Sequence, residues 1–119
     1  MHEAGLAARI VEIAEAKARQ HEAVAVRSVR LRLGEFTGVV REALDFAFEA
    51  LKRNTLLENA VLEVESVPLT GSCPDCLWVG APQQDFCLVC PQCGTPVEIL
   101  TGREMAVESI EIEEPSYVR

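Results

Sequence analysis

The sequence is poor in positive charge, in histidine and in aromatic side chains. Its 119 residues contain 11 Lys or Arg against 19 Asp or Glu, which gives a net charge of −8, and only two are histidines. A chain this acidic repels the phosphates of nucleic acid, so nucleic-acid binding is disfavoured. No apolar run approaches the roughly 20 residues that span a bilayer, and no signal-peptide pattern is visible. We therefore expect a cytoplasmic protein that binds neither nucleic acid nor membrane.

Cysteine is also absent from most of the chain. All five cysteines lie between Cys73 and Cys93. Disulfides are rare in a reducing compartment, where clustered cysteines are more often metal ligands or redox centres. The clustering therefore predicts one local metal or redox site and not a set of disulfides that cross-links the whole fold.

Two stretches have the periodicity of amphipathic helices. Residues 4–20 and 39–53 repeat apolar side chains at intervals of three or four positions, which places them on one helix face. The apolar positions are Leu6, Ile10, Ile13 and Ala14 in the first stretch, and Val40, Leu44, Phe48 and Leu51 in the second.

Three stretches alternate apolar and polar residues, as half-buried strands do. They are residues 23–35, 60–69 and 103–115. The segment between the last two is rich in Cys, Pro and Gly and short of core-forming side chains, so it needs a metal to fold. We predict an α+β fold, with two helices packed on a small three-stranded sheet and a zinc-ribbon-like module inserted between the second and third strands.

The cysteines form the motifs CPDC at 73–76 and CLVCPQCG at 87–94. Two Cys-x-x-Cys pairs supply the four thiolates of a tetrahedral zinc site. We favour Cys73, Cys76, Cys90 and Cys93, because Gly94 after the last pair tolerates the backbone angles that direct N–H groups at sulfur. Cys87 offers a competing pair with Cys90 but has no such glycine.

Spacing alone does not select the metal, so iron is an alternative to zinc. A redox role for the cysteines is disfavoured, because redox Cys-x-x-Cys motifs sit at a helix N-terminus. Residues 70–100 contain no Lys or Arg, which argues against a nucleic-acid-binding ribbon. A structural scaffold is the simplest interpretation, with Trp78 and Phe86 packing under the metal loops.

The sequence begins MHE, which places an imidazole directly behind the terminal amine. The amine of Met1, the deprotonated amide and imidazole Nδ1 of His2, and the amide or carboxylate of Glu3 form a plane of donors. Such a nitrogen-rich square suits Ni(II) or Cu(II) and is poor for tetrahedral Zn(II). By itself a histidine at position 2 is weak evidence for a metal site.

Four segments together resemble the HypA/HybF hydrogenase maturation factors: MHEAGLAARIVEIAE, VRLRLGEFTGVVREALDFAFE, the paired CPDC and CPQCG motifs, and the closing MAVESIEIE. The resemblance implies a non-enzymatic nickel metallochaperone for [NiFe]-hydrogenase assembly, with urease a further client of some members. It implies the GTPase HypB and the hydrogenase large subunit as partners, and leaves a homodimer open.

The resemblance also assigns residues. His2 becomes the principal ligand for the Ni(II) cargo, Met1 and Glu3 contribute to that site, and Cys73, Cys76, Cys90 and Cys93 hold structural Zn(II). Residues 1–69 plus 103–119 form a nickel-binding α/β domain, and residues 70–102 a zinc-binding domain. In some relatives a further histidine or acidic residue completes the nickel site. This chain has Val40 at position 40, and Glu42 is only a weak substitute for such a ligand.

Two further features have simpler interpretations. His21, at the end of the first predicted helix, is read as a solvated residue. Arg27, Arg30 and Arg32 form a basic strand face. We interpret this face first as solvent-exposed and second as a docking surface for an acidic partner. The alternatives to nickel delivery are a zinc-ribbon interaction adaptor and a thiol redox protein.

Overall fold

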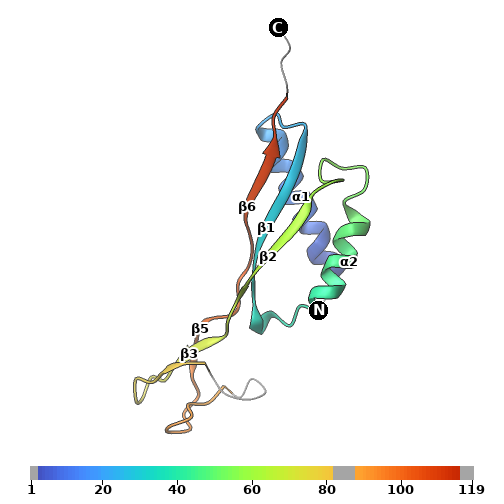
Figure 1. Ribbon diagram of the computed structural model, residues 1–119. Helices are drawn as coiled ribbons and strands as arrows, with labels where there is room; N and C mark the ends of the chain where they lie inside the picture. The colour runs from blue at the N-terminus through green and yellow to red at the C-terminus, as the bar shows by residue number, and fades with distance from the viewer. Residues whose placement is uncertain (1–2, 82–87, 116–119) are drawn as a thin grey trace. The chain divides into compact units, whose positions relative to one another are not determined.

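The computed structural model describes residues 3–81 and 88–115. This part of the chain forms two α-helices and two small three-stranded sheets (Figure 1). The predicted α+β class with two helices is therefore confirmed. In chain order the elements are α1 (Glu3–Gln20), β1 (Ala25–Gly34), the 3-10 helix η1 (Glu35–Thr37), α2 (Arg41–Leu51), β2 (Val61–Val67), β3 (Thr70–Ser72), β4 (Val79–Gly80), β5 (Glu98–Thr101) and β6 (Met105–Glu113).

Helix α1 buries a side made mostly of small residues. Ile13 is 42% exposed and lies outside this side, contrary to the prediction from periodicity. The buried residues of α1 are Ala7, Ile10, Val11, Ala14 and Ala18.

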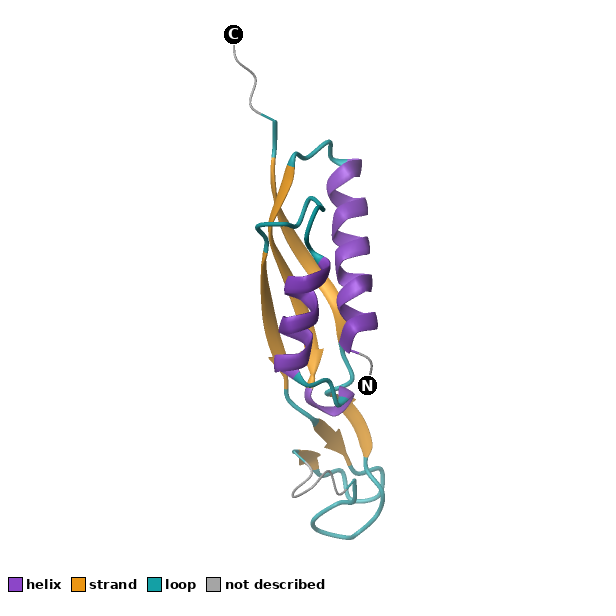
Figure 2. Cartoon of the chain, turned by 90° about the vertical axis from the view of Figure 1, so that its right-hand side faces the viewer, coloured by secondary structure: helices purple, strands orange, loops and turns teal. Residues whose placement is uncertain are grey.

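Helix α2 is three turns long and only its middle is buried. Leu44 and Phe48 are buried as predicted, whereas Val40 and Leu51 at its two ends are exposed. The two helices lie side by side on one face of the sheet formed by β1, β2 and β6 (Figures 1 and 2).

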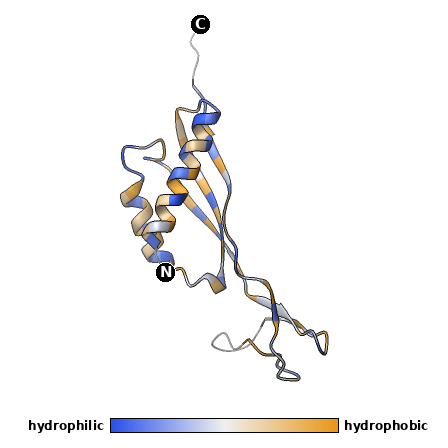
Figure 3. Cartoon of the chain, turned by 180° about the vertical axis from the view of Figure 1, so that it is seen from behind, coloured by the Kyte–Doolittle hydropathy of each residue, from blue (hydrophilic) through white to orange (hydrophobic). Residues whose placement is uncertain are grey.

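Strand β1 is the centre of that sheet, whose order is β2-β1-β6. Apolar and polar residues alternate along its strands, visible as changing colour in Figure 3. The predicted basic side chains of β1 are matched by acids from both neighbours. Arg27 contacts Glu113 at 3.3 Å, and Arg30 lies 3.7 Å from both Glu65 and Glu108. These pairs explain the alternating charges of Arg27 and Arg30 by contacts within the sheet.

The second sheet has the order β4-β3-β5 and was not predicted. Its strands are only two to four residues long, and β3 is Thr70–Ser72, with a glycine at its centre. Pairing places Gly71 opposite both Gly80 and Ile99. Strands this short carry too few residues for an alternating pattern to show, so the sequence appeared irregular there.

Contacts divide the chain into two compact units, each described here by itself. The first contains both helices and β2, and the second comprises residues 32–38 and 66–105. Residues 32–38 join the second unit through specific bonds: the carboxylate of Glu35 accepts from the N–H of Leu69 at 2.7 Å, and Phe36 N–H donates to the carbonyl of Gly102 at 2.8 Å. The range of residues 70–102 predicted for the zinc-binding domain lies within this unit.

None of the helices in the described ranges is both long enough and apolar enough to cross a bilayer.

Candidate metal centre

The first Cys-x-x-Cys motif forms a tight loop directly after β3. The N–H of Cys73 donates to the carbonyl of Trp78 at 2.7 Å, and the N–H of Leu77 donates back to the carbonyl of Cys73 at 3.1 Å. Inside the loop, the N–H of Cys76 points at the sulfur of Cys73 at 3.4 Å. The backbone therefore holds both sulfur atoms on one side of the loop.

The second motif repeats the two backbone bonds of the first loop, whereas its bond to sulfur comes from a different position of the motif. Cys90 N–H donates to the carbonyl of Thr95 at 2.7 Å, and Gly94 N–H donates to the carbonyl of Cys90 at 2.9 Å. The N–H of Gln92 points at the Cys90 sulfur at 3.4 Å. Gly94 has a φ of +77°, the left-handed conformation that its glycine was expected to supply. Leu77 holds the equivalent position in the first loop, with a φ of +65°.

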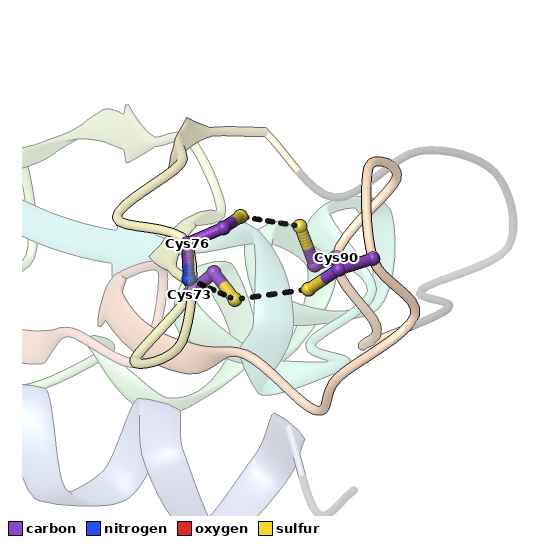
Figure 4. Close-up of side chains that lie close together, drawn as sticks. Cys73, Cys76 and Cys90 are labelled. Carbon is purple, nitrogen blue, oxygen red and sulfur yellow. Dashed lines mark hydrogen bonds between the residues drawn. The ribbon is translucent and has the colours of Figure 1, made fainter.

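The two loops bring four thiols to a common centre (Figure 4). The sulfur atoms of Cys73 and Cys93 lie 3.5 Å apart, as do those of Cys76 and Cys90. All four sulfur atoms lie within 4.8 Å of one another. A tetrahedral zinc site with Zn–S bonds of about 2.3 Å places its sulfurs about 3.8 Å apart. The cluster therefore has the size and the donor set that a structural zinc ion needs.

Hydrogen bonds also join the two loops outside the sulfur cluster. The hydroxyl of Thr95, two residues after Cys93, donates to the Asp75 carboxylate of the first loop at 2.9 Å. Bonding to the side chain and backbone of Thr95 lowers the pKa of Cys93 to about 6. Sequence reasoning missed Thr95 and Asp75, because neither residue belongs to a recognised ligand motif.

The pattern of burial divides each motif in the same way. Cys73 and Cys90 are buried, whereas Cys76 and Cys93 are exposed. In each motif, therefore, the first cysteine is packed inside the protein and the other cysteine faces solvent. The competing candidate Cys87 and the predicted packing residue Phe86 lie outside the described residues.

The predicted nickel site is only partly within the described residues. Met1 and His2 lie outside them, and Glu3 is the first residue of α1. The carboxylate Oε2 of Glu3 accepts a hydrogen bond from the backbone N–H of Val40 at 2.9 Å. Val40 is the residue that precedes α2 and provides no side-chain cap. Glu3, at the beginning of α1, therefore accepts a hydrogen bond at the beginning of α2. Periodicity alone did not predict this contact between the two helices.

Among the described residues, His21 and Glu42 lie far from the four cysteines in the sequence and make no hydrogen bond to them, whereas Trp78 belongs to the first cysteine loop. His21 is exposed in the turn that follows α1, where its N–H donates to the carbonyl of Ala18 at 3.1 Å. Glu42 is exposed in the first turn of α2. Trp78 is half-buried and packs over Gly80, consistent with local packing in the metal loops.

Comparison with known proteins agrees with these features. Residues 1–112 match the model of a family described as "Hydrogenase/urease nickel incorporation, metallochaperone, hypA". The chain belongs to the HypA family. The matched range includes both helices, the four clustered cysteines and every strand except the last residue of β6.

Relatives of this HypA-family chain match along its length. It is 43% identical over 115 residues to the hydrogenase maturation factor HypA of Roseiflexus sp. (strain RS-1), covering 96% of this chain and 94% of that protein. It is 41% identical over 119 residues to the same factor of Streptomyces avermitilis, covering 96% and 88%. The solution structure of the Ni metallochaperone HypA from Helicobacter pylori superposes with a TM-score of 0.68 at 26% identity, covering 97% of this chain and all of that one.

Proposed function

We propose that this protein carries Ni(II) at its N-terminus and delivers it during [NiFe]-hydrogenase maturation. The observation that carries the proposal is membership of a family of nickel-incorporation metallochaperones, combined with the MHE start. Urease is a second client under the same proposal, since the family description includes it. The protein acts by binding and release and is not an enzyme.

The proposed nickel donors are the amine of Met1 and the amide and imidazole of His2. The backbone amide of Glu3 completes the square, because the carboxylate of Glu3 is engaged with Val40. Nitrogen donors in a plane suit Ni(II). The amine, amide and imidazole must lose protons to bind, so nickel affinity falls as pH falls. A site on a chain end is open to ligands from a partner, which allows the cargo to be transferred.

Zinc is the proposed resident metal of the four-cysteine cluster. Cys73, Cys76, Cys90 and Cys93 hold it, and the ion cross-links the two loops. Four thiolates fill the tetrahedral sphere, so the site is structural. Under this proposal the second unit is the zinc-binding domain and the first unit the nickel-binding domain.

The proposed partners follow from the same role. They are the GTPase HypB and the large subunit of the hydrogenase, met in the cytoplasm. A metal carrier must contact both the protein that assists loading and the protein that accepts the ion.

Titration calorimetry with Ni(II) tests the proposal on the zinc-loaded protein. The His2→Ala variant should lose the tight Ni(II) site, and His21→Ala, which removes the only other histidine, should keep it. Residues added before Met1 should also weaken binding, because they convert the amine into an amide. Equal stoichiometry and affinity for the unaltered protein and His2→Ala would contradict the terminal site and favour a zinc-ribbon adaptor.

A further inference from the structure

The side chain of Thr95 lies between a clustered sulfur and a carboxylate of the other cysteine loop. Its hydroxyl oxygen is 3.3 Å from the sulfur of Cys93 and 2.9 Å from Oδ2 of Asp75. Cys93 and Thr95 belong to the second loop, whereas Asp75 lies between the two cysteines of the CPDC motif in the first. One hydroxyl therefore connects a sulfur of the second loop with the interior of the first.

The sulfur that Thr95 contacts is one of the two exposed ones. Cys93 faces the sulfur of Cys73 across the cluster at 3.5 Å. Cys73 is buried, so the close-packed interior restrains its side chain, whereas Cys93 is exposed and has less protein around it. The contact with Thr95 therefore restrains the less buried member of this pair of sulfurs.

Thr95 is itself fixed through both its backbone and its side chain. Its carbonyl accepts the N–H of Cys90 at 2.7 Å, the bond that closes the second loop. Its hydroxyl donates to the carboxylate of Asp75, and hydrogen bonds to charged groups are stronger than those between neutral ones. Without Asp75 the hydroxyl is free to turn to other staggered positions, away from Cys93. Asp75 therefore sets the orientation of the side chain that contacts the sulfur.

A bond between the loops also lowers the cost of binding one ion with both. Loops that move separately lose conformational freedom when a shared ion joins them, and this loss reduces affinity. A hydrogen bond that already joins the loops removes part of that loss. Residues that hydrogen-bond to metal ligands act in this way in many proteins, and changing one typically weakens metal binding by about 10–100-fold.

We infer that Asp75 and Thr95 are positioning residues of the zinc site, whose hydrogen bond holds the two cysteine loops together and sets Cys93 opposite Cys73. Neither residue belongs to the cluster of four thiols, so both act through the ligands and not as ligands. Zinc affinity therefore depends on two residues outside the Cys-x-x-Cys pattern. This inference rests on the proposed zinc site.

Competition with a chromogenic zinc chelator tests the inference on the full-length protein. Thr95→Val keeps the shape of the side chain but removes the hydroxyl, and should weaken zinc binding about tenfold. Thr95→Ser restores a hydroxyl and should return the affinity to within about threefold of the unaltered protein. Asp75→Ala should weaken zinc binding as Thr95→Val does, although Asp75 makes no contact with sulfur in the described structure.

Combining the two changes tests whether Asp75 acts through Thr95. If their shared bond carries the effect, Asp75→Ala should cause little further loss once Thr95→Val is present, because the bond is already gone. Asp75→Asn removes the charge but keeps an oxygen that accepts from Thr95. It should therefore lose less affinity than Asp75→Ala.

Thr101→Val is the matched control in the same unit. The Thr101 hydroxyl donates to the carbonyl of Pro68 at 2.7 Å and lies 2.6 Å from the hydroxyl of Thr70, so it is also fully engaged. Its removal should lower the thermal midpoint but leave zinc affinity unchanged. The comparison separates loss of a hydroxyl in the second unit from loss of the hydroxyl beside Cys93.

Three results would overturn the inference. They are unchanged zinc affinity in Thr95→Val, equal losses in Thr95→Val and Thr101→Val, and additive losses in the double variant, which would mean that Asp75 acts through its charge alone. A protein that retains no zinc before any substitution would overturn the zinc assignment together with the inference. Retained zinc with unaffected variants would overturn the inference alone, so the two failures are distinguishable.

Discussion

The carboxylate of Glu3 accepts a 2.9 Å hydrogen bond from the backbone N–H of Val40, 37 positions further along the chain. The bond joins the first residue of α1 to the residue before α2. A negative carboxylate is stabilised at the beginning of a helix, where N–H groups lack partners and the helix dipole is positive. Glu3 therefore has a structural role at the base of the proposed nickel site.

Substitution of Glu3 separates this role from metal ligation. Glu3→Ala removes the bond and should lower the free energy of unfolding by about 1 kcal/mol, since net hydrogen bonds contribute about that much. Glu3→Gln keeps an oxygen acceptor but loses the carboxylate, and should retain most of the stability. Chemical denaturation measures both changes.

Nickel titration of the same pair decides what Glu3 contributes to the site. If Glu3 only positions the terminus, Glu3→Gln should bind Ni(II) nearly as well as the unaltered protein. An equally large loss in both variants would identify the carboxylate as a ligand and contradict the assignment of the backbone amide.

Loss of any clustered cysteine should release zinc and unfold the second unit locally. Cys90→Ser is the most informative change, because Cys90 is buried and accepts the N–H of Gln92. Metal analysis should show about one zinc per chain in the unaltered protein and far less in the variant, since a chain segment with so few core residues depends on its metal. Helical circular dichroism should persist, because both helices belong to the first unit.

Cys87→Ser is the matched control for that experiment. It should retain zinc under the proposed assignment, in which Cys73, Cys76, Cys90 and Cys93 are the four ligands. Loss of zinc in Cys87→Ser with retention in a variant of Cys93 would mean that the ligand pairing differs from the one proposed.

Gly34 should not tolerate a side chain. A Cβ at Gly34 would lie 2.0 Å from the carbonyl oxygen of Gly102, which is a backbone atom and has no freedom to move aside. Gly34→Ala should therefore destabilise the protein by about 3 kcal/mol or more, at the upper end of the usual cost of overpacking. Thermal or denaturant unfolding measures the loss.

Gly38→Ala provides the comparison. Gly38 has a φ of +73°, but nothing lies within 4 Å of a Cβ built there. Its substitution should cost only the conformational penalty of a left-handed residue, about 1 kcal/mol. Equal losses in the two variants would show that the Gly34–Gly102 approach is not as close as described.

Glu104 should make stability depend on acid pH. Hydrogen bonds from backbone N–H groups, including that of Gly102 at 2.7 Å, lower the pKa of Glu104, and the charge of Arg32 adds to the effect. A carboxyl whose pKa is lower in the folded state stabilises the protein above its unfolded pKa, and this contribution disappears as pH falls through the folded pKa.

Glu104→Gln should therefore be less stable than the unaltered protein near neutral pH and approach it as the pH falls below 4. Denaturation midpoints measured across this range give the test. A constant difference at every pH would show that Glu104 acts through packing and not through its charge.

Sequence alone determined the elements with strong periodicity. Leu44 and Phe48 repeat at helical spacing, and the alternation along β1 identified the central strand, because burial of one face imposes these patterns on any sequence that folds this way. The four cysteines that the structure brings together were also readable, since two Cys-x-x-Cys pairs are typical of tetrahedral zinc sites.

Tertiary structure decided what local pattern does not encode. The strands of the second sheet are only two to four residues long and carry no detectable period, so their pairing was not predicted. The bond from Glu3 to Val40, the approach of Gly34 to Gly102, and the exposure of Phe46 beside a buried Phe48 depend on distant parts of the chain. Local sequence limits which conformations a segment favours, whereas contacts between segments far apart in the chain arise only when the whole fold forms.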